Sequence, residues 1–373
     1  MHRAIASILA LSVAAGTALA QGVTDTQVVL GQSVALTGPA QELGKDMQLG
    51  ASLYFNQVNA RGGIHGRRIV LKTLDDGYES VRPAENTKKL VNEDKVFALF
   101  GYVGTPTSAA SLPIFTEAKV PFVGPFTGAE LLRTPVNRYI FNVRASYYDE
   151  TEAIVQHLTA MSVDKIAVFY QNDAYGQAGL AGVERALKKR NLQIAARGTV
   201  ERNTVDVAKS VAEIRKADPQ AVVMISAYKS CAAFIKEMKR VGSNPTFWNV
   251  SFVGSKALAK ELDREGRGVQ ISQVVPFPWD SSVPVVKEYR ALLVAAKGEP
   301  GFGTLEGYIA AKVMVEGLRR AGRGLTRESF IKAMETLDPY DVGGFKVSYG
   351  HDNHNGSQFV DLTIISRNQK FVR

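Results

Sequence analysis

Short apolar runs alternate with longer segments along most of this chain. In the longer segments apolar residues recur every three or four positions, as Met47, Ala51, Phe55 and Val58 do, which predicts amphipathic helices. We expect strands at 28–34, 68–73, 165–170, 193–200, 221–225 and 247–250, helices at 47–60, 81–93, 150–161, 176–190, 205–217 and 231–241, and strand–helix pairs at 96–118 and 120–133. Strands that alternate with helices of this length predict an α/β fold with parallel sheets covered on both faces.

The alternation falls into two similar series, the second of which begins near Asp149. Residues 268–275 then carry the chain back towards the first series, and helices are expected at 284–297, 304–321 and 326–336. The segments 345–348 and 359–365 predict a final antiparallel pair of strands. This organisation predicts two lobes, each a parallel-rich sheet flanked by helices, joined by short crossing strands.

Two loops carry the most informative chemistry. Residues 98–110 read ALFGYVGTPTSAA and residues 120–129 read VPFVGPFTGA, so each apolar strand enters a loop of Gly, Pro and Thr. We expect helices to follow at 108–118 and 129–133, and unpaired N–H groups at a helix start bind anions well. Neither loop contains a Lys or a general base, so the pattern favours binding of a carboxylate over catalysis.

The N-terminal 20 residues have the features of a signal peptide. Arg3 precedes an apolar run at 4–15, and Ala18-Leu19-Ala20 is a small-x-small cleavage site. We expect export to the periplasm and cleavage after Ala20. The net charge of +9 is spread over helix surfaces, which favours a solvated basic surface over nucleic-acid binding. The single cysteine, Cys231, is expected to be a small core residue.

Several segments, taken in order, resemble the periplasmic branched-chain amino-acid-binding proteins of ABC transporters, which have the type I periplasmic binding fold. They are Leu36-Thr37-Gly38-Pro39, NARGGIHGR at 59–67, Asp75-Asp76, 101–108 and AVFYQNDAYG at 167–176. The resemblance covers about 22–373. It implies a first lobe of 21–146 and 273–345, a second of 147–272 and 346–373, and a ligand site between them. It also implies a membrane permease as partner and a monomer.

The resemblance places ligand contacts at Thr105, Phe126, Thr127, Tyr175, Tyr228 and Ser251, with Leu43 where the amino-acid binders carry an aromatic residue. Ser251 stands where those proteins use a carboxylate for the ligand ammonium, and Lys229 adds positive charge nearby. We therefore predict a carboxylate ligand without an ammonium group, held between the flat walls of Tyr102 and the other aromatic residues. The alternative is that Glu306 or Asp173 replaces the missing acid. A disulfide of some relatives would join Tyr78 and Gly104, so it is absent here.

Two motifs offer other functions. Ser226-Ala-Tyr-Lys229 matches the S-x-x-K pattern of some hydrolases, but it ends a strand and lacks the partner motifs. His351 and His354 are better explained by a hairpin turn before Asn355-Gly356 than by a metal site. No cofactor, metal or catalytic residue is expected. A solute-binding receptor is the favoured function; a periplasmic α/β hydrolase and a ligand-sensing protein of the same fold are the alternatives.

Overall fold

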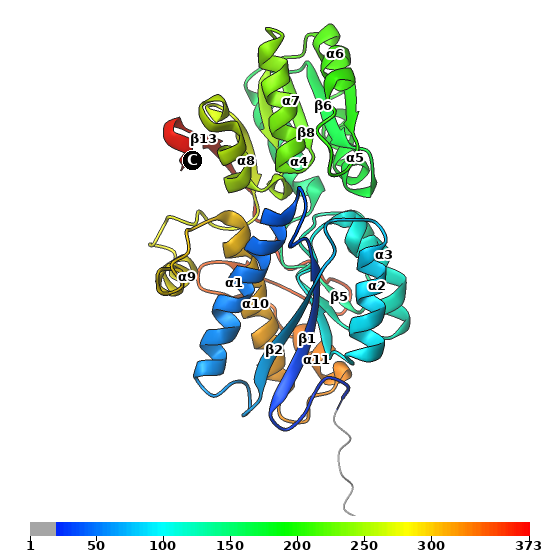
Figure 1. The fold of residues 1–373 in the computed structure, drawn as a ribbon, viewed down its shortest axis with the longest axis vertical. Helices are drawn as coiled ribbons and strands as arrows, with labels where there is room; N and C mark the ends of the chain where they lie inside the picture. Colours follow the sequence, from blue (N-terminus) through cyan, green and yellow to red (C-terminus); the bar gives the residue numbers. More distant parts are fainter. Residues whose placement is uncertain (1–19) are drawn as a thin grey trace, which may run out of the picture.

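The computed structural model describes residues 20–373, which form two lobes joined end to end (Figure 1). The predicted signal peptide, apart from Ala20, lies outside the described residues. Among the described helices, none is both long enough and apolar enough to cross a membrane. The predicted α/β fold with two parallel-rich sheets flanked by helices is confirmed.

The first lobe is built on a five-stranded parallel sheet of order β2-β1-β3-β4-β5. Its strands are β1 (Gln27–Val34), β2 (Arg68–Asp75), β3 (Ala98–Phe100), β4 (Phe122–Val123) and β5 (Ile140–Phe141). Helices α1 (Gln41–Ala60) and α10 (Phe302–Ala321) lie on one side of the sheet, and α2 (Arg82–Lys88) and α3 (Thr105–Glu117) on the other (Figure 1). Because both faces are covered, β3 to β5 are buried at every position.

Glycines allow α1 and α10 to approach closely. A Cβ added to Gly50 would lie 1.9 Å from the backbone oxygen of Thr304, and one added to Gly307 would lie 2.4 Å from that of Met47. Neither position tolerates a side chain without moving a helix. This contact fixes α10, and with it Glu306, against the first lobe although the two helices are far apart in sequence.

The second lobe contains a seven-stranded sheet of order β14-β13-β10-β9-β8-β6-β7. The strands are β6 (Ile166–Gln171), β7 (Arg197–Val200), β8 (Ala221–Ile225), β9 (Thr246–Asn249), β10 (Gln270–Gln273), β13 (Asp361–Ile365) and β14 (Phe371–Val372). Strands β6 to β10 are parallel, and β13 runs antiparallel to β10. The helices of this lobe are α4 (Tyr147–Ala160), α5 (Ala174–Lys188), α6 (Ala208–Ala217), α7 (Tyr228–Arg240) and α8 (Ser255–Leu262).

The remaining elements are short or peripheral. They are α9 (Pro284–Ala295), α11 (Arg327–Met334), β11 (Tyr340–Asp341), β12 (Lys346–Val347), the π-helical turn η1 (Lys89–Glu93), and the 3-10 turns η2 (Glu130–Leu132), η3 (Ser251–Val253), η4 (Asp263–Gly266) and η5 (Arg367–Gln369). The chain crosses between the lobes after β5, after β10 and before β13.

Three sequence predictions are corrected by the fold. The helix expected at 129–133 is only the turn η2, because Pro135 disfavours helical backbone at Thr134. The expected pairing of 345–348 with 359–365 was wrong: β12 pairs with β11, and β13 with β10 and β14. Alternating apolar residues predict a strand but not its partner, and the open edge of β10 supplied one. The turn before Asn355 is therefore not a hairpin between those strands, although Gly350 and Asn353 form a local bridge.

The third crossing occurs later than the sequence indicated. Asn355 forms a bridge with Asn142, and Tyr349 N–H donates to the Leu337 carbonyl, so residues 346–356 are bonded to the first lobe. The predicted lobe boundary at 345/346 precedes this return, because the segment satisfies its backbone groups on the end of β5 rather than on the second sheet.

Candidate functional site between the lobes

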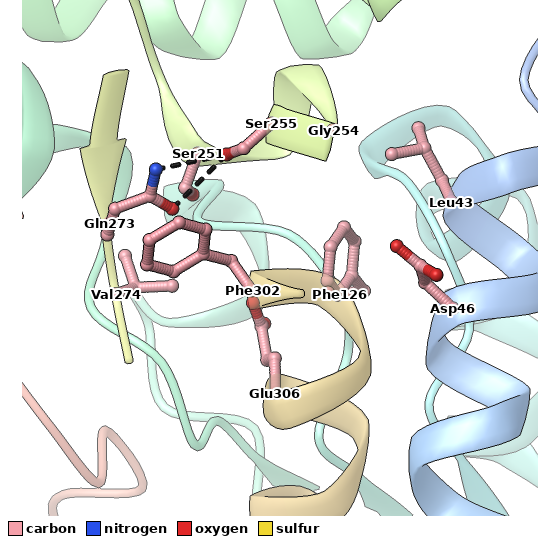
Figure 2. Close-up of a pocket in the computed structure, with 11 residues that line it drawn as sticks. Leu43, Asp46, Phe126, Ser251, Gly254, Ser255, Gln273, Val274, Phe302 and Glu306 are labelled. Atoms are coloured by element: carbon pink, nitrogen blue, oxygen red, sulfur yellow. Dashed lines mark hydrogen bonds between the residues drawn. The ribbon is translucent and has the colours of Figure 1, made fainter. Parts of the chain in front are cut away.

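A small cavity lies where the two lobes meet (Figure 2). The first lobe contributes Leu43 and Asp46 from α1, Phe126 from the loop after β4, and Phe302, Gly303 and Glu306 from α10; the second lobe and its crossing segment contribute Ser251, Gly254, Ser255, Gln273 and Val274. Its volume is about 10 Å³, roughly what one water molecule needs. A ligand the size of an amino acid can enter only when the lobes move apart.

Arg144 lies behind the lining residues Phe126, Ser251 and Glu306, which it contacts, on the segment that crosses from β5 to α4. Its side chain is 1% exposed. Nη2 donates to Glu150 Oε1 at 2.8 Å and to the hydroxyl of Ser251, while Nη1 lies 3.4 Å from Glu306 Oε1. The guanidinium carbon is 5.3 Å from the ring centre of Phe126, a cation–π contact that helps to hold the group in place.

Glu150 saturates one side of this arginine. Besides the Arg144 bond, its carboxylate accepts hydrogen bonds from Ser251 N–H at 2.7 Å, the Ser251 hydroxyl at 3.0 Å and the Ser272 hydroxyl at 2.6 Å. It stands in the first turn of α4, where the helix dipole favours a negative charge. The local sequence builds this turn, since Ser146 and Asp149 form a capping box directly before it.

Glu306 is the less satisfied carboxyl group. It projects from α10 into the site, its side chain is 7% exposed, and its contact with Arg144 is long. Burial raises its pKa from 4.5 to about 7, although Arg144 acts in the opposite direction. On the other side of the cavity, burial likewise raises the pKa of Asp46 to about 7 against the attraction of Lys256. The cavity therefore has two carboxyl groups whose charge changes near neutral pH.

Two threonines from the first lobe meet beside these groups. Thr105 begins α3, and its hydroxyl shares a 2.6 Å hydrogen bond with that of Thr127. Thr127 Oγ1 lies 3.4 Å from the Tyr147 hydroxyl at the start of α4. Tyr147 in turn contacts Tyr175, whose ring centre is 5.4 Å away. The hydroxyls and aromatic rings of both lobes thus form a continuous buried group.

Comparison with known proteins decides the family. The family profile described as "Periplasmic binding protein" matches residues 27–369. The chain belongs to the periplasmic binding protein family. Its family and fold are those of solute-binding proteins rather than of enzymes, and the resemblance noted in the sequence is confirmed.

Three relatives illustrate the similarity. A possible leucine/isoleucine/valine-binding protein from Rhodopirellula baltica SH 1 is 34% identical, with a TM-score of 0.89 over 94% of this chain and 97% of its own. A substrate-binding periplasmic protein from Ralstonia solanacearum is 32% identical, with a TM-score of 0.88 over 93% and 99%. The Leu/Ile/Val-binding protein homolog 7 of Brucella abortus (strain 2308) is 25% identical over 376 residues, which is 95% of this chain and 92% of that protein.

The predicted site residues of this periplasmic binding protein fall into three places. Leu43, Phe126 and Ser251 line the cavity. Thr105, Thr127 and Tyr175 lie in the buried group beside it. Tyr228 and Lys229 line an adjoining groove together with Glu42 and Lys256, and Asp46 lines both this groove and the cavity.

Tyr102 lies apart from all of these. Its ring packs 5.2 Å from that of Phe122, and its hydroxyl is 3.1 Å from that of Thr87 under α2. It belongs to the core between the sheet and the outer helices, because successive residues of an extended chain point to opposite sides.

The two candidate replacements for the missing acid are separated by the fold. Glu306 lines the cavity, whereas Asp173 caps α5 and pairs with Arg202 at 3.0 Å. The pairing that the resemblance implied for a disulfide also has a spatial counterpart. A Cβ added to Gly104 would lie 2.4 Å from the Tyr78 ring, so these two positions are neighbours.

Sequence reasoning missed Arg144, Glu150 and Ser272. One signal was available: Arg144 follows the largely apolar segment 139–143 and precedes Ser146 by two positions, a place where a charged residue is expected to have a buried partner. The identity of the partners could not be read from the sequence.

Cys231 and the two histidines near the C-terminus lie in different environments. Cys231 is buried, burial raises the pKa of its thiol, and it donates to the Ser226 carbonyl at 3.4 Å. His351 is exposed, whereas His354 is buried and stacks on Phe141 at 4.1 Å. Within residues 20–373, no group of three or more His, Cys, Asp or Glu side chains is arranged to bind a metal ion.

Proposed function

We propose that this protein is the solute receptor of an ABC importer and that it binds a small carboxylate between its lobes. The observation that carries the proposal is the convergence of both lobes on one buried site. Glu306 and Phe126 come from the first lobe, and Ser251 and Gln273 from the second. A ligand that contacts both sides stabilises the closed arrangement, and the closed form would dock on a membrane permease.

The ligand class follows from the chemistry of the site. A guanidinium, the start of α3 and paired threonine hydroxyls all favour an anion, and Leu43, Phe126 and Phe302 offer apolar contacts. Relatives bear the names of leucine, isoleucine and valine binding proteins. We therefore propose a branched aliphatic or aromatic carboxylate, and favour acids that lack an α-ammonium group because Ser251 provides no counter-charge.

A thermal-shift screen tests this function. Leucine, phenylalanine, 4-methyl-2-oxopentanoate and phenylpyruvate form two pairs that differ chiefly in one group. A ligand at 100 times its dissociation constant should stabilise the folded protein by about 2.7 kcal/mol. If no carboxylate in a broader panel raises the melting temperature, the proposed ligand class is wrong.

The compartment and assembly state are parts of the same proposal. We propose that the protein works in the periplasm as a monomer after cleavage following Ala20. N-terminal sequencing of exported protein should begin at Gln21, and light scattering should give the mass of one chain. Retention of Met1 on the exported product, or a dimer mass, would contradict these points respectively.

A further inference from the structure

Tyr78 lies in a tight turn of the first lobe and contacts the second lobe. Its side chain is buried, and its φ of +60° is in the left-handed region, which a bulky residue rarely adopts. Its hydroxyl accepts a hydrogen bond from Gln171 Nε2 at 3.2 Å, and its ring centre is 5.9 Å from that of Phe252. Both of these partners belong to the second lobe. A strained backbone persists where the surroundings fix the residue, and here the other lobe is part of those surroundings.

The loop that follows β7 bonds to the same turn. Asn203 Nδ2 donates to the Gly77 carbonyl at 3.1 Å and to Glu79 Oε1 at 3.0 Å. Arg202 Nη1 donates to the Tyr78 carbonyl at 3.4 Å, and the Arg202 guanidinium lies 5.6 Å from the centre of the Tyr78 ring. Asn203 also has a left-handed φ of +60°. Two tight turns, one from each lobe, therefore face each other, and we call residues 77–79 and 202–203 the clasp.

The clasp lies far from the segments that join the lobes. Residues 77–79 follow β2, the edge strand opposite β5 in the first sheet, and residues 202–203 follow β7, the edge strand remote from β10 and β13 in the second. The chain crosses between the lobes after β5, after β10 and before β13. When the lobes rotate about these crossings, the atoms farthest from them move the most, so opening separates the two halves of the clasp.

We propose that the clasp holds the lobes together in the closed form and sets the affinity for the ligand from outside the cavity. The inference deepens the proposed function and rests on it, because any contact made only in the closed form favours a receptor that captures its ligand by closing. Tyr78 and Asn203 are positioning residues, since they act on the lobes and neither lines the cavity. The Tyr78 ring is linked to the site through Phe252, whose ring centre is 4.6 Å from that of Tyr175 and 5.6 Å from that of Phe126.

Replacement of Asn203 by glycine tests the clasp with little change to the backbone. Asn203→Gly removes the amide that bonds to Gly77 and Glu79, while glycine adopts the left-handed conformation readily. Calorimetry on the full protein with 4-methyl-2-oxopentanoate and phenylpyruvate should show an affinity about tenfold weaker than that of the wild type. Small-angle X-ray scattering of the ligand-free variant should show a larger radius of gyration, because a smaller fraction of the molecules is closed.

Matched variants separate the clasp from a general effect of the substitutions. Asn191 has a φ of +57° in the same lobe, but it is exposed after the C-terminal end of α5. Asn191→Gly should therefore leave the affinity and the radius of gyration unchanged. Tyr78→Phe removes the hydrogen bond from Gln171 and should weaken affinity about threefold. Tyr102→Phe also removes a buried hydroxyl, but one that bonds within the first lobe, and it should not change affinity.

The outcomes distinguish this inference from the proposed function. If the wild type binds either acid and Asn203→Gly changes neither affinity nor radius of gyration, the inference is wrong while the receptor function stands. Equal effects of Asn203→Gly and Asn191→Gly have the same meaning, as does a lower melting temperature of Asn203→Gly without either change. If the wild type binds neither acid, nor leucine or phenylalanine, the proposed ligand class is wrong. The scattering of the ligand-free proteins then decides the inference alone, and an unchanged radius of gyration in Asn203→Gly overturns it.

Discussion

The two sides of Arg144 hold two glutamate carboxyl groups that are both buried but differ greatly in their bonding. On the second-lobe side, Glu150 accepts bonds from Arg144, from Ser251 N–H and from two serine hydroxyls. On the first-lobe side, Glu306 has one polar contact within residues 20–373, at 3.4 Å from Arg144 Nη1. The difference between the two carboxyl groups therefore lies in the number of hydrogen-bond donors around each of them, and burial does not account for it.

The backbone explains why the supply differs. Glu150 stands in the first turn of α4 and reaches the free N–H of Ser251, which opens the turn η3. Glu306 stands five residues into α10, where the N–H groups are already bonded within the helix. Of the two carboxyl groups beside the guanidinium, Glu150 is therefore held by several hydrogen bonds, whereas Glu306 makes one long contact with it.

The largest expected effect is a loss of stability when the Glu150–Arg144 ion pair is removed. Glu150→Gln should destabilise the protein by about 3–5 kcal/mol, since it leaves a buried guanidinium without the nearer of its two charged partners. Urea unfolding at pH 7 measures the loss. Glu152 on the same helix pairs with Lys189 and Arg190 near the surface. Glu152→Gln should therefore lower the free energy of unfolding by about 1 kcal/mol or less. Equal effects of the two variants would contradict the distinction.

The next largest effect concerns Glu306 and the pH dependence of the stability of the protein. Because folding raises the pKa of Glu306 from 4.5 to about 7, its contribution to stability is complete below pH 4.5 and is lost as the pH rises through 7. Glu306→Gln lacks this loss. The difference in free energy of unfolding between Glu306→Gln and the wild type should therefore shift in favour of the variant by on the order of 3 kcal/mol between pH 4.5 and pH 8.

Urea unfolding of both proteins at the two pH values measures this gain. Asp46 titrates in the same window, so only the difference between variant and wild type is informative. Parallel stability curves would show that Glu306 does not change its charge there.

A smaller effect is expected at the threonine pair. Thr105→Val should weaken binding of 4-methyl-2-oxopentanoate by roughly 1.5–3 kcal/mol, the usual range for a hydrogen bond to a charged group. Thr107→Val is the matched control, because the Thr107 hydroxyl bonds only to the carbonyls of Val103 and Gly104 among the described residues. A lower melting temperature with unchanged affinity in Thr105→Val would assign Thr105 a purely structural role.

The smallest effect marks the limit of the site. Tyr102→Phe removes a core hydroxyl that bonds to Thr87, which should cost about 0.5–1.5 kcal/mol of stability and leave affinity unchanged. Melting curves and calorimetry on the same sample test both statements. A tenfold loss of affinity would instead support the prediction from the sequence that Tyr102 contacts the ligand.

Local patterns predicted most of the secondary structure. The apolar runs at 28–34 and 221–225 and the periodic segment at 284–297 correspond closely to β1, β8 and α9. The errors lie where a decision was not local. The residues 359–365 form strand β13, but its partner is β10, about 90 positions earlier in the chain.

The sequence by itself determined the alternation of strands and helices, the two loops that bring Thr105 and Thr127 to one edge of a sheet, and the absence of an acid at Ser251. These depend on the side-chain period and on residues that are neighbours in the chain. Only the tertiary structure brought Glu306 to Arg144, 162 positions away, and Ser251 to the same guanidinium, 107 positions away. Charged residues carry no periodic signal of their own, so their partners are decided by how the lobes meet and by which donors remain unbonded there.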